Sequence, residues 1–85
     1  MSDAVAFVIS FADGTASKGT CSRVSIVDEL SVLSIDNNHA PLVTILKNGA
    51  FTLHKNQPSL SKEAIAYSNG FLRCEKNLCR ITILN

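Results

Sequence analysis

Residues 72–82, Leu-Arg-Cys-Glu-Lys-Asn-Leu-Cys-Arg-Ile-Thr, decide the fold of this chain because they specify a β-hairpin with a fixed register. A two-residue turn at 76–77 places Cys74 directly opposite Cys79 on the neighbouring strand. One face of the hairpin is then apolar and carries Leu72, Cys74, Cys79 and Ile81. The other face is mostly polar and carries Arg73, Glu75, Arg80 and Thr82, with Leu78 as the exception.

The same period of two recurs along the chain, and no window of about a dozen residues has apolar positions at helical spacing. Turn residues separate nearly all of the apolar runs at the close spacing typical of sandwiches and barrels. The predicted strands are Val5–Phe11, Thr20–Val27, Val32–Ile35, Leu42–Leu46, Ala50–His54, Ala64–Ser68, Phe71–Cys74 and Cys79–Leu84. The sequence therefore predicts an all-β fold, a flattened β-sandwich or barrel of about eight to ten short, mostly antiparallel strands.

Size and composition limit what such a chain can do. Its 85 residues support a single domain, 1–85, and apolar residues make up 46% of them while charged residues make up only 18%. Because so few residues are charged, we expect part of the surface to be covered permanently by a partner protein. The net charge is +1 and the eight Lys and Arg residues are scattered, so nucleic acid is not an expected ligand.

The N-terminus bears on where the protein is located, and the cysteines bear on the redox state of that compartment. The apolar run at 4–9 follows no basic leader and is too short to span a membrane, so we expect a cytoplasmic protein in the compartment where it is made. Three cysteines do not form a secreted disulfide framework, and we expect reduced, mostly buried thiols. A Cys74–Cys79 disulfide, or half of a metal site with Cys21 as a third ligand, is the alternative, but tetrahedral zinc needs four ligands.

Two other readings of individual residues are weaker. His39 lies near Asp36 and several serines, but no nucleophile elbow, oxyanion loop or phosphate cradle accompanies it, so we expect no catalytic site. Four Phe and one Tyr could stack single-stranded bases on an oligonucleotide-binding barrel, but the sequence has no basic groove. The aromatic side chains fit core packing better.

Residues 36–44, Asp-Asn-Asn-His-Ala-Pro-Leu-Val-Thr, form a second informative stretch, in which a polar turn leads into a strand. Asn tolerates positive φ, and Pro41 pushes Ala40 into an extended conformation, so a strand from Leu42 follows. With Ser68-Asn69-Gly70-Phe71-Leu72, this stretch resembles the epsilon subunit of F-type ATP synthases, called delta in mitochondria. The resemblance runs from Phe7 to Leu84 and covers the N-terminal β-sandwich domain of that subunit. Its other pieces are Phe7-Val8-Ile9, Gly19 before Cys21–Val27, Leu33-x-Ile35, Lys47-Asn48-Gly49 before Phe51-Thr52-Leu53, and Ile81-Thr82-Ile83-Leu84.

The chain departs from the family pattern in three places. The family usually has Pro-Gly where this chain has Asn37-Asn38, and Asn is a reasonable substitute for a left-handed Gly. A frequent acidic residue of the family falls on Val32, so an ionic contact with the membrane rotor would come from Asp28 or Glu29, or be absent. Family members commonly continue into a C-terminal helical hairpin associated with inhibition of ATP hydrolysis. If the natural chain ends at Asn85, we expect it to couple without that inhibition.

The resemblance implies a mechanical role. The chain is expected to be a non-catalytic central-stalk (rotor) subunit of a proton-translocating ATP synthase, which couples the gamma subunit to the ring of c subunits. It would lie peripherally on the cytoplasmic side of the energy-coupling inner membrane, without membrane insertion. No cofactor, metal or nucleotide site is expected.

The loop from Asp28 to Val32 and the turn from Asp36 to His39 would both lie at the rotor-ring end of the domain. The expected rotor contacts are Asp28, Glu29, Leu30, Ser31, Val32 and His39. A stand-alone β-sandwich module that binds some other protein is the alternative.

Overall fold

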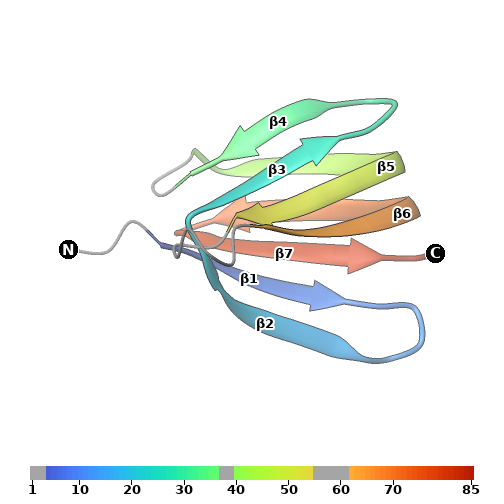
Figure 1. The fold of residues 1–85 in the computed structure, drawn as a ribbon, viewed down its shortest axis with the longest axis horizontal. Coiled ribbons are helices and arrows are strands. Elements are labelled where there is room, and N and C mark those ends of the chain that lie inside the picture. The colour runs from blue at the N-terminus through green and yellow to red at the C-terminus, as the bar shows by residue number, and fades with distance from the viewer. Residues whose placement is uncertain (1–3, 37–39, 55–61) are drawn as a thin grey trace.

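Strands and turns make up the whole of the computed structural model, which describes residues 4–36, 40–54 and 62–85. The seven strands of these residues are β1 (Val5–Ser10), β2 (Ala16–Cys21), β3 (Arg23–Val27), β4 (Val32–Ile35), β5 (Leu42–His54), β6 (Lys62–Glu75) and β7 (Leu78–Ile83) (Figure 1). No helix that is long and apolar enough to span a membrane occurs in this part of the chain. The all-β prediction is confirmed.

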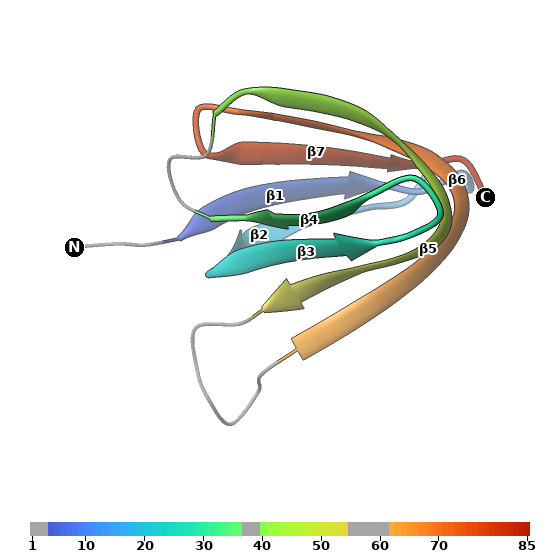
Figure 2. The ribbon, with the colours of Figure 1, turned by 90° about the horizontal axis from the view of Figure 1, so that it is seen from above.

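The strands form one hydrogen-bonded sheet in the order β2-β1-β7-β6-β5-β3-β4. The β1–β7 pair is parallel, and the other neighbouring pairs are antiparallel. The long strands β5 and β6 curve together, so the sheet folds over on itself (Figure 2), while its edge strands β2 and β4 lie on opposite sides of the molecule (Figure 1). The sheet thus makes the two layers of a β-sandwich, as predicted. One layer contains β2, β1 and β7, and the other contains β3 and β4.

The described residues contain seven strands where about eight to ten were expected, because two expected interruptions are bends inside continuous strands. β5 covers the runs predicted at 42–46 and 50–54, and β6 covers those predicted at 64–68 and 71–74. Asn48 has a left-handed φ of 50°, as its turn character indicates. The β5–β6 pairing nevertheless continues on both sides of Asn48, in the same register. Turn residues therefore bend these strands without ending them.

One predicted strand is divided instead. The run at 20–27 splits at Ser22, whose N–H and Oγ–H both donate to the carbonyl of His54, at 2.7 and 2.8 Å. β2 also begins at Ala16 rather than at Thr20, although its first residues are polar or small. Pairing with β1 extends β2, because strand formation depends more on neighbours than on intrinsic propensity.

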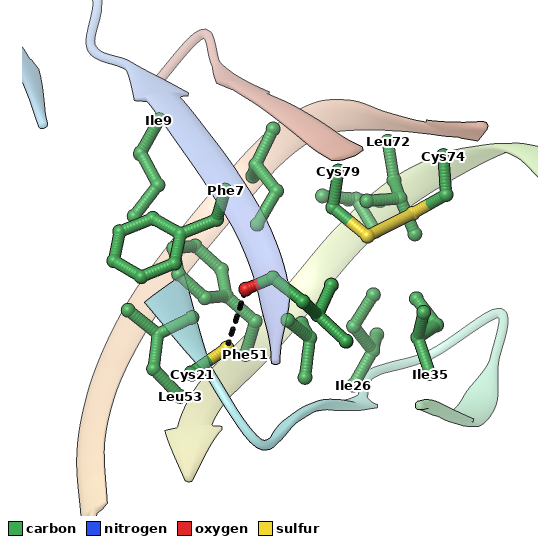
Figure 3. Packing of buried hydrophobic residues seen from close by; sticks show 14 of the residues in the cluster. Phe7, Ile9, Cys21, Ile26, Ile35, Phe51, Leu53, Leu72, Cys74 and Cys79 are labelled. Carbon is green, nitrogen blue, oxygen red and sulfur yellow. Dashed lines mark hydrogen bonds between the residues drawn. A yellow bond between two sulfur atoms is a disulfide. The ribbon is translucent and has the colours of Figure 1, made fainter. Parts of the chain in front are cut away.

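The C-terminal hairpin has the register that its sequence specifies. Lys76 and Asn77 adopt left-handed φ values of 53° and 61°, and Cys74 pairs with Cys79. The two cysteines form a disulfide, with their Cα atoms 4.1 Å apart (Figure 3). The prediction of reduced thiols was therefore wrong for this pair, because the predicted register brings the sulfur atoms together. Cys21 is a free, buried thiol, as expected.

The core lies between the two layers and is built from alternate residues of the strands, except that β2 contributes only Cys21 (Figure 3). Phe51 lies at its centre, fully buried, and stacks on Tyr67 with ring centroids 6.1 Å apart. Gly19 on β2 leaves room for the Phe7 ring, because a Cβ at this position would lie 3.1 Å from the ring and would require it to shift slightly. The buried residues are Val5, Phe7, Ile9, Cys21, Val24, Ile26, Ile35, Leu46, Phe51, Leu53, Tyr67, Leu72, Cys74, Cys79, Ile81 and Ile83.

Candidate partner-binding surfaces

Three large apolar side chains on the outer side of the β5–β6 pair face solvent. Val43, Ile45 and Phe71 are 71%, 66% and 45% exposed, and we call them the β5–β6 strip. Ile45 pairs directly with Phe71 across the two strands. Their neighbours Leu46 and Leu72 are fully buried, so the alternation of a strand requires the strip to point outward. Exposed apolar side chains that gather in this way mark interaction sites.

A second exposed apolar group lies where β3 turns into β4. Val27, Leu30 and Val32 are 62%, 58% and 79% exposed, and we call residues 27–32 the β3–β4 tip. Val27 pairs with Val32 at the base of the tip. The tip is short, so its apolar side chains are held close together.

Asp28 fixes the shape of the tip from within. Its Oδ1 accepts hydrogen bonds from the backbone N–H groups of Leu30 and Ser31, at 2.8 and 2.9 Å. Its Oδ2 accepts from the N–H of Lys47 at 3.1 Å and from the hydroxyl of Tyr67 at 2.5 Å. The carboxylate therefore joins the tip to the bends in β5 and β6.

These contacts perturb two pKa values. Partial burial raises the pKa of Asp28, but the hydrogen bonds from the Tyr67 hydroxyl and from three backbone N–H groups outweigh burial, so the pKa is lowered overall. Burial raises the pKa of Tyr67 above its ordinary value, and the hydrogen bond to the Asp28 carboxylate and its negative charge raise it further. Asp28 is thus ionised, and Tyr67 is a neutral donor, at physiological pH.

Further hydrogen bonds hold the β3–β4 tip against the bend of β5 at Lys47 and Asn48. The N–H of Glu29 donates to the carbonyl of Lys47 at 3.0 Å, and the amide of Asn48 donates to the Glu29 carboxylate at 2.9 Å. A Cβ at Gly49 would overlap Asp28 and the backbone of β3. Glycine is thus required at this bend because the tip packs directly against it.

The structure separates the predicted contact residues into different roles. The Asp28 side chain is engaged inside the tip, and the Glu29 carboxylate is held by Asn48. Leu30 and Val32 present apolar side chains to solvent, while Ser31 is half-buried. His39 lies outside the described residues. The assignment of these six residues to a rotor interface stays a prediction.

The expectation that residues 28–32 and the turn beginning at Asp36 share one end of the molecule was wrong. Asp36 pairs with Arg23 at 2.8 Å, at the opposite end of the β3–β4 hairpin from the tip. The four-residue strand β4 lies between them and spans roughly 13 Å. An antiparallel hairpin cannot bring both ends of one strand to the same side.

Sequence reasoning did not single out the β5–β6 strip. A usable signal was present in residues 42–46, Leu-Val-Thr-Ile-Leu, where apolar residues occupy both phases of the strand. A strand buried on one face needs apolar residues in one phase only. The second phase, which carries Val43 and Ile45, therefore indicates another apolar surface.

One sheet folded into two layers, with apolar side chains exposed on its outside, defines this molecule as a β-sandwich domain. The family described as the ATP synthase delta/epsilon chain β-sandwich domain has a model that matches residues 5–84. The chain belongs to this family. The family indicates a delta or epsilon subunit of ATP synthase, a membrane-associated complex in which such subunits are generally non-catalytic. A comparison with curated proteins finds no match.

Proposed function

We propose that this chain, as a single domain, is a non-catalytic rotor subunit of the central stalk of a proton-translocating F-type ATP synthase. It couples the gamma subunit to the ring of c subunits. The observation that carries this proposal, beside the family, is the exposure of Val43, Ile45 and Phe71 on the outside of a folded sheet. Three apolar side chains on one surface favour a protein partner, because their burial contributes about 1.5–3 kcal/mol each.

The β5–β6 strip is the surface that we assign to gamma. It lies on paired strands whose opposite face packs in the core, so the backbone beneath it is held on both sides. A rigid apolar surface loses little conformational entropy when a partner covers it. Contact over the strip would therefore bind gamma firmly enough to move with it.

The β3–β4 tip is the surface that we assign to the c ring. Leu30 and Val32 would make the contact, and Asp28 would act as a positioning residue, because its carboxylate is already used inside the tip. Such a contact reaches the membrane through the ring and needs no insertion of this chain. The subunit would then lie peripherally, on the cytoplasmic side of the energy-coupling membrane.

The sandwich is suited to transmitting torque. Its interior is closely packed, and close-packed interiors are stiff. The Cys74–Cys79 disulfide ties β6 to β7 in the layer that carries the strip. A stiff body between two contact surfaces passes a rotation from one to the other with little loss.

Binding to purified gamma tests the proposal most directly. A tagged form of the chain is mixed with gamma and analysed by size-exclusion chromatography with light scattering, and a 1:1 complex is expected. The complex is then mixed with detergent-solubilised c ring, which it should retain, while a Leu30→Asp, Val32→Asp variant of the chain should lose the ring but keep gamma. A chain that stays monomeric in the presence of gamma would support a stand-alone interaction module instead.

A further inference from the structure

Cationic side chains form a row across the outer face of one layer of the sandwich. Register alone places them there, because the paired residues of five neighbouring strands line up. The row reads Val43, Arg73, Arg80, Val8 and Lys18, from β5 to β2. Three of the eight Lys and Arg residues of the chain therefore share one line on one face, although they are scattered in sequence.

Arg73 and Arg80 are direct cross-strand partners. Like charges in this position are destabilising, so the pair calls for a compensating negative charge. Arg73 has one, because its Nη2 and Nε lie 3.0 and 3.1 Å from Oε1 of Glu75. Arg80 has no acidic partner within residues 4–36, 40–54 and 62–85. Its guanidinium is thus available to a group from outside the chain.

The same two arginines border a hollow of about 400 Å³ at the end of the β6–β7 hairpin. Glu75, Lys76 and Leu78 complete its lining. Three cations and one carboxylate leave a net charge of +2 around this hollow, whereas the whole chain carries +1. The excess of positive charge around the hollow therefore favours the binding of an acidic group there.

The hollow continues directly into the β5–β6 strip. Val43 pairs with Arg73, and Phe71 precedes Arg73 by two positions on the same face. An apolar centre bordered by polar, charged groups is the usual anatomy of a protein interface. Guanidinium groups bind carboxylates through two parallel hydrogen bonds, which adds geometric specificity at such a border.

We propose that the partner covering the β5–β6 strip places an aspartate or glutamate side chain in this hollow, bound by Arg80 and flanked by Arg73 and Lys76. This inference rests on the proposed function, in which that partner is gamma. It specifies the chemistry of the partner surface: apolar opposite Ile45 and Phe71, and acidic opposite the end of the β6–β7 hairpin. Arg80 then serves as a specificity-determining contact as well as a surface charge.

Affinity for purified gamma, measured by titration calorimetry, tests this inference. Arg80→Gln is expected to weaken binding roughly tenfold, because it leaves the partner's carboxylate unpaired, and Arg80→Glu is expected to weaken it further. Arg23→Gln is the matched control, because it removes the same charge from the opposite outer face. Raising NaCl from about 0.05 M to about 0.5 M should weaken the wild-type complex more than the Arg80→Gln complex.

The outcomes separate this inference from the proposed function. No binding of gamma by the wild-type chain would overturn both. Equal affinities and equal salt dependences of the wild type and both Arg80 variants would overturn this inference alone, as would tighter binding by Arg80→Glu. Thermal unfolding provides a check without gamma: Arg80→Gln should keep or raise the midpoint, and a lower midpoint would show that Arg80 has a stabilising partner within the chain.

Discussion

The two outer faces of the sandwich differ in what they offer to solvent. The face over β2, β1, β7 and the paired halves of β6 and β5 carries the β5–β6 strip and the cationic row. The face over β4, β3 and the other halves of β5 and β6 carries small side chains such as Ala64, Ala66 and Ser34. Two pairs of its polar side chains contact each other, because Ser25 Oγ lies 2.9 Å from His54 Nε2 and Arg23 forms an ion pair with Asp36. This difference favours the first face as the surface for the proposed contact with gamma, and it leaves the tip as the exposed apolar group of the second face.

The largest effect on binding is expected from a charge placed within the β5–β6 strip. Ile45→Asp should weaken binding to gamma roughly 100-fold, because it places a charge in an apolar contact. Ala66→Asp makes the matched change on the same strand pair, in the half that belongs to the other layer, and should leave the affinity within about twofold. Surface plasmon resonance on immobilised gamma measures both. Equal losses for the two variants would contradict the distinction between the faces.

The Cys74–Cys79 disulfide joins β6 to β7 in the layer that carries the β5–β6 strip, and it has no counterpart among the described residues of the other layer. Replacing Cys74 and Cys79 by Ser should lower the free energy of unfolding by about 2 kcal/mol, from the lost restriction of the unfolded chain. Urea unfolding with and without a reductant measures the change. Reductant should destabilise the wild type and leave the double variant unaffected. Three titratable thiols in the non-reduced, denatured wild type, instead of the single Cys21, would contradict the bond.

The tip depends on Asp28, and Asp28→Asn should cost about 1–2 kcal/mol of stability at neutral pH. The lowered pKa means that the Asp28 carboxylate contributes stability above the unfolded pKa of about 4 and loses that contribution as pH falls through the folded pKa. Wild type and variant should therefore converge in stability at low pH. Urea unfolding at neutral and acidic pH measures this convergence.

Tyr67→Phe provides the partner control for Asp28. It removes one of the four hydrogen bonds to the carboxylate and should cost about 1 kcal/mol. A difference between wild type and Asp28→Asn that stayed constant down to low pH would contradict an ionised, hydrogen-bonded Asp28.

The smallest effect on stability is expected on the outer face of the layer that contains β3 and β4. The Arg23–Asp36 ion pair has side chains that are 51% and 58% exposed, so Asp36→Asn should change stability by less than about 0.5 kcal/mol. It should also leave binding to gamma unchanged. Thermal unfolding at low and high salt measures the first expectation. A loss above about 1 kcal/mol would show that this face depends on its charges more than surface pairs usually do.

Sequence reasoning went furthest where the signal is local. The hairpin at 72–82 combines a two-residue turn with alternation on both sides, so its register was predictable and is confirmed at Cys74 and Cys79. The same register should have favoured the disulfide over free thiols. The sequence predicts a turn around Asn48 that separates two strands, and neighbouring residues alone do not reveal that β5 continues through it.

The amino-acid sequence by itself determined the all-β class and the face that each residue of the last hairpin presents, because a period of two is set by neighbouring residues. Tertiary structure decided the rest. It brought Tyr67 to Asp28 across 39 positions and placed β7 beside β1 in parallel. It also aligned Lys18, Arg80 and Arg73 in one row. Such arrangements depend on how distant strands pair, and that choice rests on the packing of the whole core rather than on any single segment.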